Sequence, residues 1–151
     1  MSETGITARV NDAMKAAMRA RERERLATIR LIQSEFKRII VDERVDIDDA
    51  RALAILDRMI KQRRDSSNQY REAGRAELAA QEDFEIGIIQ EFLPDALSDE
   101  ELDAVIEEAI ADSGASGMQA MGPVMAYLKP RVQGRADMST VSQRVKARLA
   151  G

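Results

Sequence analysis

The sequence predicts an all-α protein, because apolar residues recur at helical spacing along almost the whole chain. The first apolar stripe, with steps of three and four residues, comprises Ile6, Val10, Met14 and Ala17. Similar stripes follow in residues 26–40, 53–60 and 102–110. Such steps place each set on one side of a helix, and no run of alternating β-branched residues competes with them. We therefore expect an N-terminal bundle of about four helices and a small C-terminal unit of three helices.

The first helical segment is compatible with two structures. Residues 6–43 contain no Gly or Pro, so one long helix or a helical hairpin would fit. The apolar stripe has a gap at Ala20–Glu24. This gap favours a turn near Arg21–Arg23, which would make a hairpin.

The next elements have local start and stop signals. Residues 45–48 are expected to form a turn in which Asp46 or Asp48 caps a helix. Gly74 fits the left-handed residue that follows a helix. A further helix should run from about Ala76 to Phe92 and end before Pro94, since a residue that precedes proline disfavours helical geometry. We expect an N-terminal unit over residues 1–93, a linker over 94–97 and a C-terminal unit over 98–151.

The C-terminal unit should contain three helices. Ser98–Glu101 has the pattern of a capping box that opens the first of them. Ser113–Gly117 interrupts the pattern, and the next helix is predicted over Met118–Leu128, stopped by Pro130. The last helix is predicted over Met138–Leu149. The spacing of Met118, Met121 and Met125 favours core filling, with an adaptable groove for a partner as the alternative.

Charge is strongly sorted along the chain. Residues 76–128 hold 13 acidic and no basic residues. Residues 1–75 hold 17 basic and 13 acidic residues, and residues 129–151 hold 6 basic and 1 acidic. The net charge of −4 therefore conceals a basic–acidic–basic arrangement. An anionic partner would bind the flanks, and the acidic middle would face water or a basic protein.

The composition excludes several kinds of chemistry. The sequence has no Cys and no His, which removes nucleophiles activated by histidine and zinc sites built from thiolate or imidazole. There is also no phosphate-binding glycine loop. From these absences together we expect no cofactor and no metal. No apolar run approaches the length of a membrane span, and the polar N-terminus does not resemble a secretory signal. We expect a cytoplasmic protein.

Two basic clusters are candidate phosphate-binding surfaces. One comprises Arg19, Arg21, Arg23, Arg25 and Arg30, and the other comprises Lys61, Arg63 and Arg64, with Arg71 and Arg75 beyond. The alternative for each is a solvated helix face with local ion pairs. Glu82 and Glu85 lie one turn apart and could perform acid–base work, but a solvated face or pairing with Arg63 or Arg75 is the expectation. Only five aromatic residues are present, so RNA would be read through phosphate and shape and not by stacking.

Several segments together resemble the GatB/YqeY family over roughly residues 6–149. These segments are AMRARERERLATIR (17–30), KQRRDS (61–66), YREAGRAEL (70–78), EDFEI (82–86), FLP (92–94), MGPVM (121–125) and GRAD (134–137). Their order and spacing carry the match. The residues of the family motifs are Glu82, Glu85, Pro94, Met121, Gly122, Met125, Gly134 and Asp137.

The resemblance implies a function in translation. The family comprises free-standing proteins and the tail of the B subunit of tRNA-dependent amidotransferase, where the tail helps to hold the tRNA. On this basis the expected nucleic-acid contacts are Arg21, Arg23, Arg25, Arg30, Lys61, Arg63, Arg64, Arg75, Lys129, Arg131 and Arg135. No residue is assigned a catalytic role. The expected partners are tRNA or a protein of the translation machinery.

Two positions depart from the family pattern. Glu22 stands where the family usually has Asp before its second helix, and glutamate is a poorer N-cap. Pro123 replaces a residue that is often basic or polar, which places a proline in a short helix and moves its expected start toward Gly122.

Three functions are compatible with the sequence. The first is a non-catalytic tRNA-binding or amidotransferase-associated module. The second is a protein–protein adaptor that uses the acidic middle. The third is an amide-transfer or hydrolytic activity that rests on Glu82 or Glu85. The family resemblance implies its form as a carbon–nitrogen ligase with glutamine as amido donor.

Overall fold

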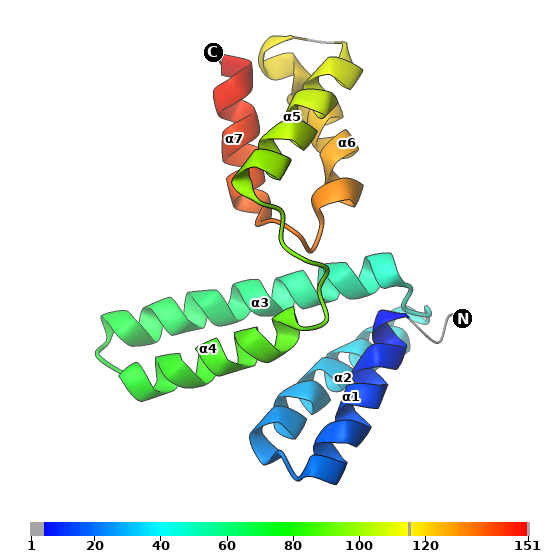
Figure 1. Cartoon of the computed structure of the whole chain (residues 1–151), viewed down its shortest axis with the longest axis vertical. Helices are drawn as coiled ribbons and strands as arrows, with labels where there is room; N and C mark the ends of the chain where they lie inside the picture. Colours follow the sequence, from blue (N-terminus) through cyan, green and yellow to red (C-terminus); the bar gives the residue numbers. More distant parts are fainter. Residues whose placement is uncertain (1–4, 115, 151) are drawn as a thin grey trace. The chain divides into compact units, whose positions relative to one another are not determined.

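The prediction of an all-α protein is confirmed by the computed structural model, which describes residues 5–114 and 116–150 and contains no strand within them. The helices are α1 (Ile6–Ala20), α2 (Arg23–Glu43), α3 (Asp49–Glu72), α4 (Ala76–Gln90), α5 (Asp99–Ser113), the 3₁₀ helix η1 (Gly117–Ala120), α6 (Met121–Val132) and α7 (Met138–Ala150) (Figure 1). They form two compact units, residues 1–93 and 94–151, which we describe separately.

The first helical segment is a hairpin and not one long helix. Arg21 adopts the left-handed conformation, with φ of 58°, and reverses the chain between α1 and α2. The N–H groups of Arg21 and Glu22 donate to the carbonyls of Met18 and Ala17 and so satisfy the end of α1. The gap in the apolar stripe predicted this turn, because a polar segment has no face to bury. Glu22 precedes α2 as its N-cap residue, and its side chain makes no capping hydrogen bond, which agrees with glutamate being a poor N-cap.

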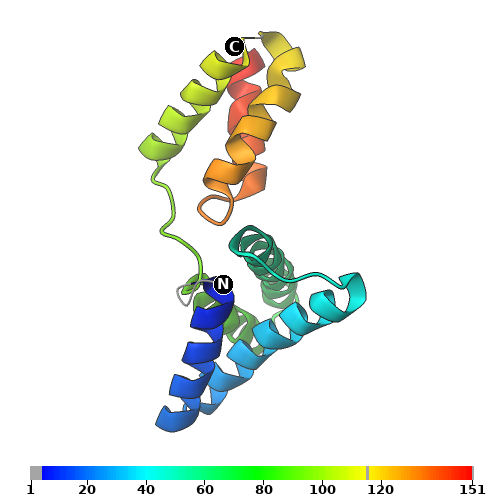
Figure 2. The same cartoon turned by 90° about the vertical axis from the view of Figure 1, so that its right-hand side faces the viewer.

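The core of the first unit lies where the α1–α2 hairpin meets the second hairpin, α3–α4. Both hairpins are visible in Figures 1 and 2. Each contributes an apolar stripe, and the side chains of Val10, Ile29, Ile32, Leu56 and Ile89 are fully enclosed. Burying side chains of this size contributes about 1.5–3 kcal/mol each to stability. The apolar stripes therefore determine which faces of the four helices meet.

The outer part of the α3–α4 hairpin is held mainly by polar contacts. Beyond Ile60 on α3 and before Ile88 on α4, the buried side chains are those of Ser67 and Ala79. The Ser67 hydroxyl donates to Asp83 at 2.7 Å, and Arg71 forms an ion pair with the same carboxylate. The three polar turns of α3 therefore pack against α4 with little apolar surface between them.

Local signals place the helix ends as predicted. Asp48 caps α3, accepting a hydrogen bond from the Arg51 N–H at 2.8 Å. Gly74 follows α3 with φ of +74°, a left-handed conformation that favours glycine. Ser98 and Glu101 form a reciprocal capping box at the start of α5, with both bonds at 3.1 Å.

The second unit packs α5, α6 and α7 around its own apolar core. The fully buried side chains include those of Ile106, Val124, Leu128 and Val141. The Asp137 carboxylate accepts from the backbone N–H and the hydroxyl of Thr140 and so begins α7.

Two expectations for the second unit are wrong. The predicted helix over Met118–Leu128 is instead η1 followed by α6, and Pro130, the predicted stop, lies inside α6. The start of α6 at Met121 agrees with the shift toward Gly122 that Pro123 led us to expect. Proline removes one backbone donor, but only two helical residues follow Pro130, so the last turn of α6 persists. Pro123 lies in the first turn of α6, where proline is tolerated. Met118 does not fill the core, since its side chain on η1 is 53% exposed.

No helix in residues 5–114 or 116–150 is long and apolar enough to cross a membrane.

Replacing Ile89 by alanine should lower the free energy of unfolding by about 2–5 kcal/mol, because a fully buried side chain would leave a cavity. Urea denaturation followed by circular dichroism would measure the loss. The control is Leu78→Ala on the same helix, whose side chain is 39% exposed and whose removal should cost less than about 1 kcal/mol. Equal losses for the two variants would contradict this description of the core.

Candidate nucleic-acid interface

The predicted basic contact residues lie in both units. Eight belong to the first unit, between Arg21 and Arg75, and three belong to the second, between Lys129 and Arg135. Each group is therefore considered within its own unit. Four of these side chains have intramolecular partners, and the others make no hydrogen bond or ion pair with any residue that the structure describes.

Arg25 is engaged in the fold of the first unit. Its two terminal nitrogens donate to the two carboxylate oxygens of Glu91 at 2.6 and 2.8 Å, and its Nε lies 3.7 Å from Glu22. The hydrogen bonds to Glu91 raise the pKa of the guanidinium above its usual value. This bidentate contact connects the start of α2 to the end of α4. A phosphate could use Arg25 only by displacing Glu91.

Arg63 is also engaged, in an ion pair that is largely shielded from water. Its Nε lies 3.8 Å from Glu85 on α4, and the two side chains are 16% and 13% exposed. A second nitrogen of Arg63 donates to the Met59 carbonyl at 3.2 Å. Burial raises the pKa of the Glu85 carboxyl, Arg63 opposes the rise, and Glu82 adds to it. Of the two partners predicted for these carboxylates, Arg63 pairs with Glu85, and Arg75 makes no ion pair with either.

Two predicted contacts of the second unit are partly occupied as well. Arg131 donates to the Tyr127 carbonyl at 2.7 Å, and its guanidinium lies 3.6 Å from the centre of the Tyr127 ring. This stacking is a cation–π contact on the surface of α6. Arg135 donates through Nε to the Asp95 carbonyl at 2.9 Å, and its own carbonyl accepts from the Leu97 N–H. Arg135 therefore holds residues 95–97 against the turn before α7.

The other predicted cations are exposed and without partners among the described residues. They are Arg21, Arg23, Arg30, Lys61, Arg64, Arg75 and Lys129. Arg21, Arg23 and Arg30 lie on the α1–α2 hairpin, Lys61 and Arg64 on α3, and Arg75 on the α3–α4 turn. Lys129 lies on α6. A free, hydrated cation can contact a phosphate without first breaking an internal ion pair.

The acidic middle of the chain does not simply face water. In the first unit, Asp83, Glu85 and Glu91 pair with Arg71, Arg63 and Arg25. In the second unit, Arg144 of α7 pairs with Asp99 at 2.7 Å and with Asp103 at 3.1 Å, both on α5, and Arg148 pairs with Glu107. The sequence interpretation therefore needs a correction, since much of the acidic segment binds arginines of the flanking segments. The pair Arg63–Glu85 was among the predicted ones, whereas the sequence could not show the others because their partners lie far apart in the chain.

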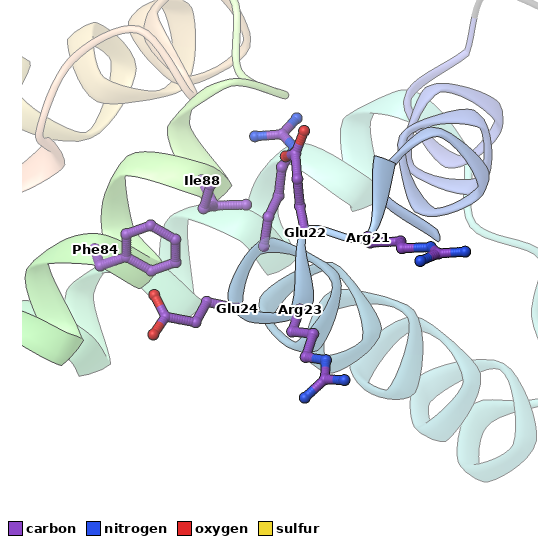
Figure 3. A pocket seen from close by; sticks show the side chains of 7 residues that line it. Arg21, Glu22, Arg23, Glu24, Phe84 and Ile88 are labelled. Carbon is purple, nitrogen blue, oxygen red and sulfur yellow. The ribbon is translucent and has the colours of Figure 1, made fainter. Parts of the chain in front are cut away.

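A groove lies between the α1–α2 turn and α4. It has a volume of about 540 Å³, and its lining residues are Arg21, Glu22, Arg23, Glu24, Arg25, Phe84 and Ile88. Glu24 lies beside the Phe84 ring, whereas Arg21 and Arg23 point away from that ring (Figure 3). The groove therefore presents an aromatic ring and a carboxylate, and its neighbouring cations are directed elsewhere.

Three exposed cations of the α1–α2 hairpin, each without a hydrogen bond or ion pair to a described residue, were absent from the predicted list of contacts. Lys15 and Arg19 lie on α1, and Lys37 lies on α2. Lys37 follows Arg23 and Arg30 at an interval of seven residues. This interval, about two helical turns, is the signal that could have identified it.

The residues of the family motifs have structural positions. Glu82 and Glu85 belong to α4, where Glu85 lies against Arg63 of α3, and Pro94 opens the segment that leads to α5. Met121, Gly122 and Met125 belong to α6, and the two methionines pack partly buried against the core of the second unit. Gly134 and Asp137 form the turn into α7, with Gly134 at φ of +77°. Within residues 5–114 and 116–150, no three acidic side chains are grouped to hold a metal.

Comparison with known proteins gives two findings. Residues 7–149 match the family model described as Yqey-like protein. The chain is also similar to "Altered inheritance of mitochondria protein 41, mitochondrial" from Pyrenophora tritici-repentis (strain Pt-1C-BFP). The two are 24% identical over 147 residues, which cover 95% of this chain and 81% of that protein. The name of that relative assigns it to mitochondria, and the compartment of this chain stays a prediction.

The Glu85 carboxyl should titrate above the usual range of glutamic acid, and that of Glu101 below it. Burial favours the protonated form of Glu85, whereas the Ser98 N–H and hydroxyl favour ionised Glu101. Glu85 therefore makes stability fall as the pH rises from its unfolded to its folded pKa. The contribution of Glu101 to stability depends on pH in the opposite sense. It is present above the usual pKa of glutamic acid and is lost as the pH falls from that value through the lower folded pKa.

Carbon-detected NMR of the two carboxyl groups would give both midpoints. The variant Arg63→Gln should raise the Glu85 midpoint further, because it removes the opposing positive charge. The Glu101 midpoint should not move, since its low pKa is caused by the hydrogen bonds from Ser98. A Glu85 midpoint below the usual range would contradict the structure.

Proposed function

Because this chain belongs to the Yqey-like protein family, we propose that it is a non-catalytic helical module that binds transfer RNA or associates with an amidotransferase. This function follows the resemblance to the tail of the amidotransferase B subunit, which helps to hold the tRNA. The binding groups are side chains on helices and on the turns that join them, and the chain works alongside the translation machinery.

The observation that carries this proposal is the set of exposed cations that have no internal partner. Six of the predicted contacts in the first unit are of this kind: Arg21, Arg23, Arg30, Lys61, Arg64 and Arg75. Neighbouring arginines such as Arg25 and Arg63 are already paired with carboxylates. The fold thus separates arginines that hold helices together from cations that are available to phosphate. In the second unit, Lys129 is the matching available cation.

Glu82 and Glu85 have a structural role in this proposal. Glu85 lies against Arg63 at the α3–α4 contact, where its ionised form is disfavoured by burial and favoured by the guanidinium. The pair contributes specificity of packing to the hairpin. A ligase activity would need a binding site for the amide donor near these carboxylates, and the groove described above is lined by other residues.

A protein–protein adaptor is the second candidate, favoured by exposed apolar side chains on the acidic helix α4. Leu78 and Phe84 are 39% and 38% exposed, and they lie on a helix whose residues include Glu77 and Asp83. Such a surface would suit a partner with both basic and apolar side chains. Affinity capture separates the two candidates, because recovery of protein partners that resist ribonuclease, without RNA, would favour the adaptor.

Electrophoretic titration with bulk tRNA should detect binding at 50 mM salt. If three or four phosphates are contacted, affinity should be roughly 40- to 150-fold weaker at 200 mM salt, because bound counterions are released. The variant Lys61→Gln/Arg64→Gln/Arg75→Gln should bind more weakly and with a smaller salt dependence.

The control is Arg38→Gln/Arg51→Gln/Arg71→Gln, which removes the same charge from arginines that are paired with Glu35, Glu43 and Asp83. This variant should keep most of the affinity. Absence of tRNA binding to the unmodified chain at 50 mM salt would reject the proposed function.

A further inference from the structure

The solvent side of the α1–α2 hairpin carries a set of cations that we call the hairpin face. Its members are Lys15 and Arg19 on α1 and Arg23, Arg30 and Lys37 on α2. All five side chains are exposed, and none has a hydrogen bond or ion pair with a described residue. α1 and α2 lie next to each other near their shared turn (Figure 2), and the side chain of Gln33 on α2 donates to that of Asn11 on α1 at 2.9 Å. Lys15 and Lys37 each lie one helical turn after a member of this pair, so the two rows border the same contact between the helices.

Helical geometry places these cations in two rows. Arg23, Arg30 and Lys37 are seven residues apart, which is close to two helical turns, so they lie on one side of α2 at intervals of about 10.5 Å. That side is opposite the buried stripe that includes Ile32 and Phe36. On α1, Lys15 and Arg19 are one turn apart, opposite the buried side chains of that helix.

The carboxylates of α2 are held away from the hairpin face. Glu35 and Asp42 pair with Arg38 on another side of the helix. Glu43 pairs with Arg51 at the start of α3 at 2.6 Å, and Glu24 lies beside Phe84 of α4 (Figure 3). On α1, Asp12 lies three residues before Lys15 and seven before Arg19, so this carboxylate shares their side of the helix. The five cations outnumber it, and the hairpin face therefore presents net positive charge.

The hairpin face also lacks an aromatic ring. Phe36 and Phe92 are buried in the core of the first unit, and Tyr70 and Phe84 belong to α3 and α4. Proteins that bind single strands generally stack bases on aromatic side chains. A surface of cations alone can contact phosphates but offers no platform for an unpaired base.

We infer that the hairpin face binds the phosphate backbone of double-helical RNA. This inference rests on the proposed function, and it names the structure of the RNA and the residues that contact it. A helix holds the cations of α2 in a rigid row, and a double helix presents phosphates in a rigid, regular array. A single strand gains little from such a row, because it must be ordered before its phosphates match the spacing.

The test compares the two forms of one RNA. Fluorescence anisotropy of the full chain would be measured with a labelled RNA duplex of about 16 base pairs and with its separate strands, between 50 and 200 mM salt. The duplex should bind at least about fivefold more tightly than either strand. In Arg30→Gln/Lys37→Gln, the slope of log affinity against log salt should fall by about two, one for each lost phosphate contact.

The matched control is Arg38→Gln/Arg51→Gln, which changes the net charge equally but removes cations that are paired with carboxylates. Its slope should change by less than about half of that amount. Equal binding of duplex and single strands would overturn the inference, as would equal effects of the two variants. Circular dichroism would verify that each variant keeps its helices.

Bulk tRNA in the same assay separates this inference from the proposed function. If tRNA binds and Arg30→Gln/Lys37→Gln leaves the slope of log affinity against log salt unchanged, the inference about the hairpin face is rejected and the proposed function stands. If the unmodified chain binds no tRNA, both are rejected.

Discussion

The absence of basic residues between positions 76 and 128 constrains the rest of the molecule. The acidic helices α4 and α5 cannot neutralise their own carboxylates, so their partners must come from helices elsewhere in the sequence. Arg25, Arg63 and Arg71 provide this for α4, and Arg144 and Arg148 provide it for α5. Each unit thus contains one acidic helix and the arginines that bind it. Arg38 and Arg51 pair with carboxylates of α2, and the cations that have no internal partner are the ones available to a ligand.

These ion pairs specify the packing more than they stabilise it. Exposed pairs such as Arg71–Asp83 contribute little free energy, because both groups are well hydrated when apart. The shielded pair Arg63–Glu85 costs desolvation, and the Nε of Arg63 has no hydrogen-bond partner. The apolar stripes provide the main stabilisation. The polar contacts then select one register between α3 and α4, because another register would leave the guanidinium and the carboxylate apart.

Features that depend on neighbouring residues could be predicted from the sequence. The turn at Arg21, the Asp48 cap and the Ser98 capping box each rest on a few adjacent side chains. The pair Arg25–Glu91 could not be predicted, since 66 residues separate its members and only the packing of α2 on α4 brings them together. The stop at Pro130 failed for a related reason. The enclosed Leu128 and Val132 continue the apolar stripe across the proline and hold the last turn of α6 in the core.

The sequence predicted that the candidate site would consist of clustered cations, but not which of these cations are available to a ligand. The density of arginines around Arg21–Arg30 drew attention to sequence neighbours, yet adjacent helical residues point in different directions. Arg25 turns toward α4, whereas Arg23 and Arg30 face the solvent. Lys37 escaped notice because it lies outside the dense segment, although it shares a side of α2 with them. Spacing along a helix, and not local density, determines which cations act together.

The weakly packed outer part of the α3–α4 hairpin has a consequence for how the chain can change in length. Its side chains contribute almost nothing to the enclosed core, since only Ser67 and Ala79 are buried there. Deleting or inserting two turns in both helices at once would preserve the side that each helix turns toward the other. The core residues around Leu56 and Ile89 would stay in place. Such insertions or deletions would change the distance from the core to Arg75, at the end of the hairpin, without changing the fold.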